Sequence, residues 1–220
     1  MAKKLKRSKR YGLNSLPLDW REQIFSTILS KRLKLAVAVL GVTGCRPVEL
    51  EQGVRIRIVK GNLVIKILGA KVDLATGRGQ PVRHLIVDNT TQSGMYLFNH
   101  LKNIPSHAAD IKYDAGAVSE RLREKSRKLW PRRKYLVSAY TYRHYIGKSL
   151  KEAGETVQKI ACTLGHASDF SQTVYGRAGG AKRSAGGHGI IHASASNDVR
   201  HSAKSDRLNR FTQNKAPKND

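Results

Sequence analysis

A histidine and a tyrosine near the end of an apolar segment are the first residues with a spacing suited to chemistry. His166 follows Gly165, which ends the helix-like run 157–164 because glycine tolerates the left-handed conformation at a helix end. Tyr175 comes nine residues after His166. A turn and a short helix between them would bring both side chains to one phosphate, where the imidazole donates a hydrogen bond and the tyrosine hydroxyl attacks phosphorus. The same pattern also occurs in plain packing, so the rest of the chain decides.

Arg46 and Glu49 form a second candidate pair at a predicted helix start. Gly44 stops one helix, and Pro47 suits the first position of the next, where its missing N–H is not needed. Glu49 follows Arg46 by three residues, within reach of an ion pair. The guanidinium of Arg46 presents paired donors that fit a phosphate. A surface ion pair at a helix start is the alternative interpretation.

Lys71, Tyr140 and Arg143 are the remaining residues suited to phosphate chemistry. Lys71 begins the predicted loop between two strands, from which its ammonium can reach out and donate a proton. Tyr140 and Arg143 lie three residues apart and therefore share one face of a predicted helix. A lone loop lysine is usually only solvated, so these residues become informative when they are taken together with the others.

The charge of the chain predicts a polyanionic partner. Lys and Arg number 41 against 16 Asp and Glu, which gives a formal net charge of +25. Such an excess favours nucleic acid, with binding that weakens as salt rises; a ribosome-associated or generally basic protein is the alternative. The predicted contacts to the DNA backbone come from a basic helix and the segment after it, through Arg121, Arg123, Lys125, Arg132 and Arg133.

Helices and a small sheet must position these residues. Apolar residues at helical spacing predict the helices, and strict alternation of apolar and polar residues predicts the strands. We therefore expect an α+β fold that is mainly helical, with a small three-stranded antiparallel sheet. The expected strands are 54–59, 63–68 and 82–87, and the expected helices are 20–29, 33–42, 90–102, 115–129, 138–153 and 157–164.

Composition divides the chain into three parts. We expect a basic N-terminal arm at 1–18, one folded domain at 19–176 and a basic flexible tail at 177–220, with both tails disordered. No apolar run approaches the roughly 20 residues of a membrane span, and no secretory leader is visible. Cys45 and Cys162 show no metal-ligand spacing. These features predict a cytoplasmic, nucleoid-associated protein without metal or cofactor.

Taken in order, the candidate residues resemble the catalytic domain of the tyrosine recombinases, the phage integrase and Xer-like family. The resemblance covers roughly residues 20–176. Tyr140 stands where histidine is commonest in the family, a position that also accepts other residues. The matching segments are Thr43-Gly44-x-Arg46-x-x-Glu49-Leu50, Gly69-Ala70-Lys71, Tyr140-x-x-Arg143-His144, Leu164-Gly165-His166 and Tyr175.

The resemblance implies an enzyme that cuts and rejoins DNA through a 3′-phosphotyrosine intermediate, without metal or ATP. Tyr175 would be the nucleophile, and the guanidiniums of Arg46 and Arg143 would stabilise the charge that develops on the phosphate oxygens. Lys71 would protonate the departing 5′ oxygen. The supporting roles would fall to His166 and Tyr140, which would hydrogen-bond the phosphate, and to Glu49, which would orient Arg46 or His166.

The resemblance also implies partners. These are double-stranded DNA, a homotetramer on two DNA sites, and an accessory DNA-bending protein. Because only about twenty residues precede the resembling region, we do not expect the N-terminal helical domain that clamps DNA in the family. Three alternatives stay open: a type IB topoisomerase with similar chemistry, a truncated or inactive recombinase that only binds DNA, and a basic RNA- or ribosome-binding protein, which would have no use for Tyr175.

Overall fold

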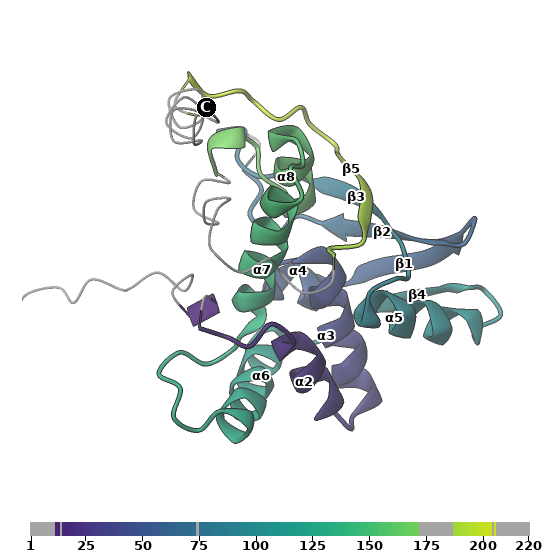
Figure 1. Cartoon of the computed structure of the whole chain (residues 1–220). Coiled ribbons are helices and arrows are strands. Elements are labelled where there is room, and N and C mark those ends of the chain that lie inside the picture. Colours follow the sequence, from purple (N-terminus) through teal and green to yellow (C-terminus); the bar gives the residue numbers. More distant parts are fainter. Residues whose placement is uncertain (1–11, 14, 74, 172–186, 204, 206–220) are drawn as a thin grey trace, which may run out of the picture.

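The computed structural model of the protein describes residues 12, 13, 15–73, 75–171, 187–203 and 205. Within them, an antiparallel sheet packs one face against helices, which confirms the expected mixture of helices and antiparallel strands (Figure 1). The elements are α2 (Trp20–Ser26), α3 (Lys31–Thr43), α4 (Pro47–Gln52), β1 (Val54–Val59), β2 (Asn62–Leu68), β3 (Val82–Val87), α5 (Gln92–Lys102), β4 (Ala108–Ile111), α6 (Ala115–Leu129), α7 (Ala139–Glu152), α8 (Val157–Leu164) and β5 (Ile190–Ala195).

Helix α3 lies at the centre of the helical layer because its sequence is apolar on nearly every side. Val37 and Leu40 are fully buried, and the helix packs against both α5 and α7. Ser30 caps its start by accepting a hydrogen bond from the amide of Leu33 at 3.4 Å. Gly44 ends it with a φ of +59°, in the left-handed region that favours glycine. The end of α3 is therefore fixed immediately before Arg46.

The sheet has the alternating burial that the sequence predicts for its central strands. Ile56, Ile65 and Leu85 are paired across β1, β2 and β3 and are fully buried against the helices. Arg55 and Lys66 form the neighbouring pair and point to the opposite, exposed face. Because side chains alternate along a strand, this register assigns each residue of β1–β3 to one face of the sheet.

The expectation of a three-stranded sheet is wrong, because the sheet has five strands in the order β4-β1-β2-β3-β5. The expectation of a structureless tail is also wrong for residues 187–203, which contain β5. This strand pairs antiparallel with β3, and Ile190 anchors it with 2% of its surface exposed. A strand added at a sheet edge is held by backbone hydrogen bonds, so β5 can form although it contains small Ala and Ser residues.

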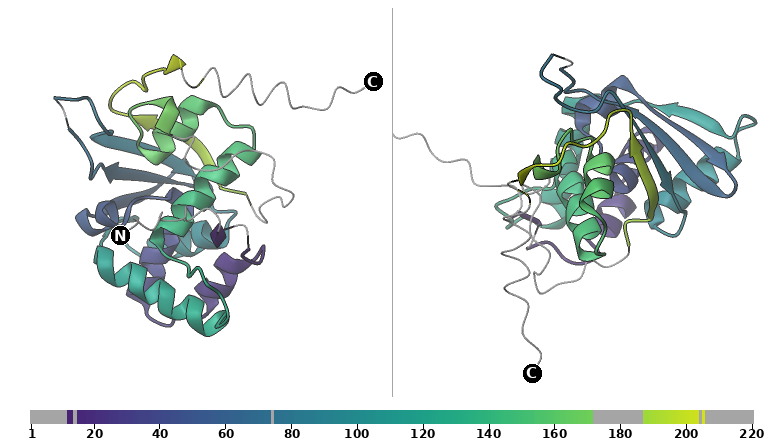
Figure 2. Two further views of the ribbon diagram at one scale, coloured as in Figure 1. Left: turned by 90° about the vertical axis from the view of Figure 1, so that its left-hand side faces the viewer. Right: turned by 90° about the horizontal axis from the view of Figure 1, so that it is seen from above.

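The C-terminal part of the chain therefore returns to the body of the molecule. Helix α8 packs against both β3 and β5, and β5 lies alongside β3 in all three views (Figures 1 and 2). Residues 172–186, which include Tyr175, lie outside the described part of the chain, as do residues 206–220. Among the described residues, no helix is long and apolar enough to cross a membrane.

The N-terminal boundary of the folded body lies earlier than residue 19. Leu13 and Leu16 are buried in the main hydrophobic core with Trp20. Arg133 holds the same segment by donating hydrogen bonds to the carbonyl oxygens of Gly12 and Ser15. The C-terminal part of the expected arm at 1–18 therefore belongs to the folded body, through residues 12, 13 and 15–18. Residues 1–11 and 14 lie outside the described part of the chain.

Candidate active site

Glu49 is the centre of a cluster of charged side chains at the start of α4. The amide of Arg46 donates to Glu49 Oε2 at 2.7 Å, and Arg46 Nη1 donates to Oε1 at 2.6 Å. The Glu49 side chain is fully buried, whereas 14% of the Arg46 side chain is exposed. The pair that the spacing predicts is therefore formed inside the protein, with the guanidinium of Arg46 still in contact with the surface.

A second arginine, Arg83 on β3, completes the environment of Glu49 and was missed from the sequence. Its Nη1 lies 3.1 Å from Glu49 Oε1 and its Nη2 lies 2.7 Å from Oε2, so the carboxylate is bound by a bidentate fork. Arg83 is fully buried. Its position could have been found, because Arg83 has the same strand parity as Leu85 and Val87, which face the core.

Arg143 on α7 connects the two helix ends on either side of the cluster. Its Nη1 donates to the carbonyl of Gly44 at 3.0 Å, and its Nη2 donates to the carbonyl of Leu164. These carbonyls lie at the C-termini of α3 and α8, which are the negative ends of the helix dipoles. Nη2 also lies 3.2 Å from Nε2 of His166. The fully buried guanidinium thus joins the segment that contains Gly44 and Arg46 to the segment Leu164-Gly165-His166.

Glycine is required where α8 ends beside the cluster. Gly165 has a φ of +64°, so the chain turns sharply there and presents His166 immediately afterwards. A Cβ atom added to Gly165 would lie 2.8 Å from Nη1 of Arg83. The Leu-Gly-His pattern therefore has two local causes, a left-handed helix end and the close approach of a buried guanidinium.

The arginines determine the charge states of Glu49 and His166. Burial opposes ionisation of Glu49, but Arg83, Arg46 and Arg143 outweigh it and lower the pKa of this carboxyl to about 2. Burial, together with the positive charges of Arg143, Arg46 and Arg83, also lowers the pKa of His166 to about 2. His166 is consequently neutral at pH 7. Because a guanidinium only donates, Nε2 accepts from Arg143 and Nδ1 carries the imidazole proton.

This neutral histidine predicts a pH dependence of stability. In the unfolded chain an imidazole takes up a proton below its usual pKa of 6.5, whereas His166 in the folded chain does not until about pH 2. The unfolded state then binds more protons, so the free energy of unfolding falls as pH decreases below 6.5. Between pH 6.5 and 4.5, we expect the wild type to lose up to about 1.4 kcal/mol per pH unit more than His166→Gln.

Denaturant unfolding across this pH range measures the effect. The window ends at pH 4.5 because Glu49, with its own lowered pKa, begins to reduce stability only below that value. The matched control is His84→Gln, at an exposed position on the outer face of β3. Equal slopes for wild type and His166→Gln would contradict a buried neutral imidazole.

The other predicted site residues lie outside this cluster. Lys71 is exposed at the start of the loop between β2 and β3, as expected, and among the described residues its ammonium makes no hydrogen bond or ion pair with the cluster. Tyr140 is half-buried in the first turn of α7, one turn before Arg143. Tyr175 lies outside the described residues. The roles of these three residues therefore stay predictions.

The basic residues predicted to bind DNA fall into two groups. Arg121 and Arg123 lie on the exposed side of α6 and pair with Glu124 and Glu120, each at 3.0 Å. Such exposed pairs contribute little to stability, so both guanidiniums stay accessible to other anions. These two arginines, together with the exposed Arg132, keep the predicted role in DNA binding.

Lys125 and Arg133 also hold the protein together. Lys125 Nζ donates to the carbonyl of Thr27 at 2.8 Å and so attaches α6 to the end of α2. Arg133 donates to the carbonyl of Tyr135 at 3.3 Å in addition to its contacts with the N-terminal segment. Replacing either residue would therefore change the packing of the chain as well as its charge.

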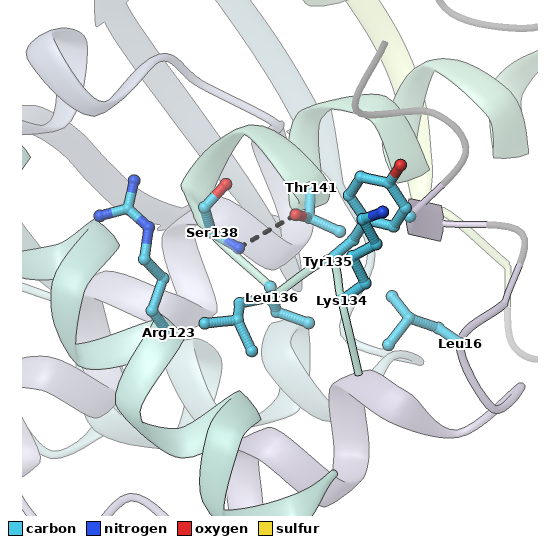
Figure 3. Close-up of a pocket in the computed structure, with 9 residues that line it drawn as sticks. Leu16, Arg123, Lys134, Tyr135, Leu136, Ser138 and Thr141 are labelled. Carbon is cyan, nitrogen blue, oxygen red and sulfur yellow. Dashed lines mark hydrogen bonds between the residues drawn. The ribbon is translucent and has the colours of Figure 1, made fainter. Parts of the chain in front are cut away.

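A separate cavity of about 280 Å³ lies at the N-terminal end of α7 (Figure 3). Tyr135 and Leu16 lie on one side of it and Arg123 on the other. Ser138 starts α7 there, its amide donating to Thr141 Oγ1 at 3.0 Å. None of the residues of the charged cluster lines this cavity. Within the described chain, no group of three or more His, Cys, Asp or Glu side chains is arranged to hold a metal ion.

Comparison of the structure with solved structures identifies the class of fold. The chain is similar to the XerA recombinase, with a TM-score of 0.51 and 17% identity over 99% of this chain and 67% of XerA. It is also similar to the XerH site-specific recombinase in a pre-cleavage complex with its difH substrate, with a TM-score of 0.50 and 16% identity over 70% of this chain and 46% of XerH. A post-cleavage complex of XerH gives the same TM-score and identity over 78% of this chain and 48% of XerH.

The chain has the fold of a Xer-like tyrosine recombinase catalytic domain. It spans less than half of each XerH chain. The sequence itself matches no protein-family model and no curated protein sequence at a significant level.

Proposed function

We propose that the protein is a site-specific tyrosine recombinase that cuts and rejoins double-stranded DNA through Tyr175. The observation that carries the proposal is the joining of Arg143 to His166 beside the Arg46–Glu49 pair, which unites three separate sequence motifs in one electropositive site. The fold is of the same class as that of the XerH site-specific recombinase, which was solved in complex with its difH substrate. The formal net charge of +25 suits a DNA partner.

The proposed reaction is a transesterification. The hydroxyl oxygen of Tyr175 attacks phosphorus and loses its proton to a nearby base or water, and the bond from phosphorus to the 5′ oxygen breaks. Lys71 gives a proton to the departing oxygen, so the products are a 3′-phosphotyrosine and a free 5′ hydroxyl. The reverse reaction rejoins the strand without ATP because the ester is conserved.

The cluster supplies the electrostatic part of this mechanism. Arg46 and Arg143 would stabilise the negative charge on the non-bridging oxygens, a kind of contact whose loss typically slows a reaction by about 100- to 1000-fold. His166 would donate to an oxygen through its Nδ1 proton, and Tyr140 would add a hydrogen bond from the first turn of α7. Glu49 holds Arg46 in place and limits the net charge of the buried guanidiniums.

Recombination would require further partners. We propose that four protomers act on two DNA sites, with an accessory DNA-bending protein, and that the protein works in the cytoplasm at the nucleoid. We also propose that the folded domain, which begins near residue 12 and extends through β5 to residue 203, is the catalytic unit. The second candidate function is that of a DNA-binding protein without cleavage activity, which the same charge would support.

A covalent trapping assay tests the proposal. The protein is incubated with supercoiled plasmid carrying its flanking DNA, in EDTA and without ATP, and then quenched with detergent. We expect a protein-linked nick with the wild type and none with Tyr175→Phe, because phenylalanine lacks the attacking oxygen. Salt-sensitive binding by both proteins, with no covalent product from either, would favour the non-cleaving alternative.

A further inference from the structure

The chain after β5 runs across the two loops that flank the charged cluster. We call residues 196–203 with Ser205 the C-terminal strap. Gln80, near the end of the loop that starts at Lys71, is 1% exposed and forms hydrogen bonds with the strap. Its Nε2 donates to the carbonyl of Asn197 at 2.9 Å, and its Oε1 accepts from the Asn197 amide at 3.0 Å. The same Nε2 also donates to the carbonyl of His166 at 3.3 Å.

Arg200 makes the second connection between these loops. Its Nη2 donates to the carbonyl of Gly77 at 2.9 Å, in the middle of the Lys71 loop. Its amide donates to the carbonyl of Ala167 at 2.9 Å, and its carbonyl accepts from the amide of Asp169 at 3.2 Å. The backbone of Arg200 is thus fixed to the turn that follows His166, while its side chain holds the loop of Lys71.

Asp169 anchors the far end of the strap. This carboxylate is 3% exposed and accepts from the Ser202 amide at 3.0 Å and from Ser205 Oγ at 2.7 Å. Nδ1 of His201 lies 2.7 Å from its other oxygen. Val199 packs on α8, against Ala161 and Cys162. The strap is therefore attached firmly to the side of the site that carries His166.

The loop of Lys71 needs such an attachment. It projects from the sheet, most of its residues are exposed, and Gly77 and Gly79 both have positive φ angles. Within the loop, Asp73 and Arg78 pair through their backbones. Gln80 and Arg200 connect this loop to the turn after His166 through their hydrogen bonds.

We propose that Arg200 and Gln80 are positioning residues that hold Lys71 at the distance from His166 needed to protonate the departing 5′ oxygen. This inference rests on the proposed function. A displacement of the donor by about 1 Å can slow a reaction by about 100-fold, and general acid catalysis contributes about 100- to 10,000-fold. Removing the contact of Arg200 with Gly77 would therefore impair proton donation and leave the attack by Tyr175 intact.

A change of leaving group separates positioning from a structural role. In DNA with a 5′-bridging phosphorothiolate, sulfur replaces the departing oxygen. The bond from phosphorus to sulfur then breaks to give a thiolate, which leaves without a proton because a thiol has a pKa of about 8.5. Formation of the covalent complex is measured on this DNA and on ordinary DNA of the same sequence.

The variants are Arg200→Ala, Gln80→Leu and Lys71→Ala, with Arg55→Ala as the control. Arg55 is a suitable control because its side chain is 66% exposed on β1, and its loss removes the same charge without touching the strap. We expect Arg200→Ala and Gln80→Leu to slow the reaction on ordinary DNA by about 10- to 100-fold. On the sulfur-containing DNA, we expect both variants, and Lys71→Ala as well, to react within about twofold of the wild type.

The outcomes are distinguishable. An equal loss by Arg200→Ala on both substrates, or no loss on either, would overturn the positioning role. A wild type that forms no covalent complex with either DNA would instead overturn the proposed function. Thermal unfolding of each variant identifies those that fail to fold, and the exposed Arg200 allows the test to proceed even if the buried Gln80 does not tolerate replacement.

Discussion

Replacement of Arg143 by alanine is expected to reduce formation of the covalent complex by about 100- to 1000-fold, the usual effect of removing one preorganised donor from a transition state. DNA binding should weaken by less than about tenfold, since only one phosphate contact among many is lost. Trapping on plasmid and a binding titration at fixed salt measure the two quantities. An equal loss of both would mean that Arg143 acts only on the fold.

The contacts of Arg143 make a structural control necessary. Its guanidinium satisfies the buried carbonyls of Gly44 and Leu164, and each unsatisfied buried acceptor costs about 1–3 kcal/mol. Arg143→Lys retains the charge but cannot reproduce the planar fork. We expect this variant to unfold closer to the wild-type temperature and still to cleave poorly, which separates the loss of chemistry from the loss of stability.

Replacement of Glu49 by alanine is expected to lower the free energy of unfolding by about 3–5 kcal/mol. The reason is that Arg83 is fully buried and would lose the carboxylate that binds both of its terminal nitrogens. Chemical denaturation at pH 7 measures the change. The control is Glu51→Ala, at an exposed position on the same helix, which should stay within about 0.5 kcal/mol of the wild type.

A double replacement tests whether the buried charge is the cause. Exchanging both Glu49 and Arg83 for apolar residues of similar size, as in Glu49→Leu with Arg83→Met, removes the unpaired charge and should recover much of the stability. Cleavage should remain low, because Arg46 would still lack the carboxylate that orients it. A double variant no more stable than Glu49→Ala would contradict this explanation.

Much of the fold was predictable because local patterns agree with it. The strands 54–59 and 82–87 have the predicted bounds, since each alternates between buried and exposed residues. Helices 115–129 and 157–164 also have the predicted bounds, since a cap residue precedes each of them. The strand 190–195 was missed because its pairing with β3 comes from the edge of a sheet formed much earlier in the chain, and its own composition resembles a linker.

The site was predictable where a motif fixes a local geometry. Arg46 with Glu49, and His166 after a helix-ending glycine, depend on neighbours within a few residues. Arg83 and Gln80 are different, because their importance comes from residues far away in the sequence. To predict the role of Arg83, one would need both its strand parity and the position of Glu49 in the fold. To predict the role of Gln80, one would need the path of the strap. The alternation along the strand indicates only that Arg83 faces the core, and no local pattern indicates the partner of either residue.

The strap also affects the order in which parts of the structure fold while the chain is being synthesised. Gln80 and Asn197 are 117 residues apart, so their contact forms only after most of the chain has been synthesised. Contacts of such large sequence separation form slowly because a long loop must close first. During synthesis, the helices and the strands β1–β3 can fold while the Lys71 loop is still unattached. The Lys71 loop would therefore reach its final position relative to His166 only after the rest of the sheet and the helices have folded.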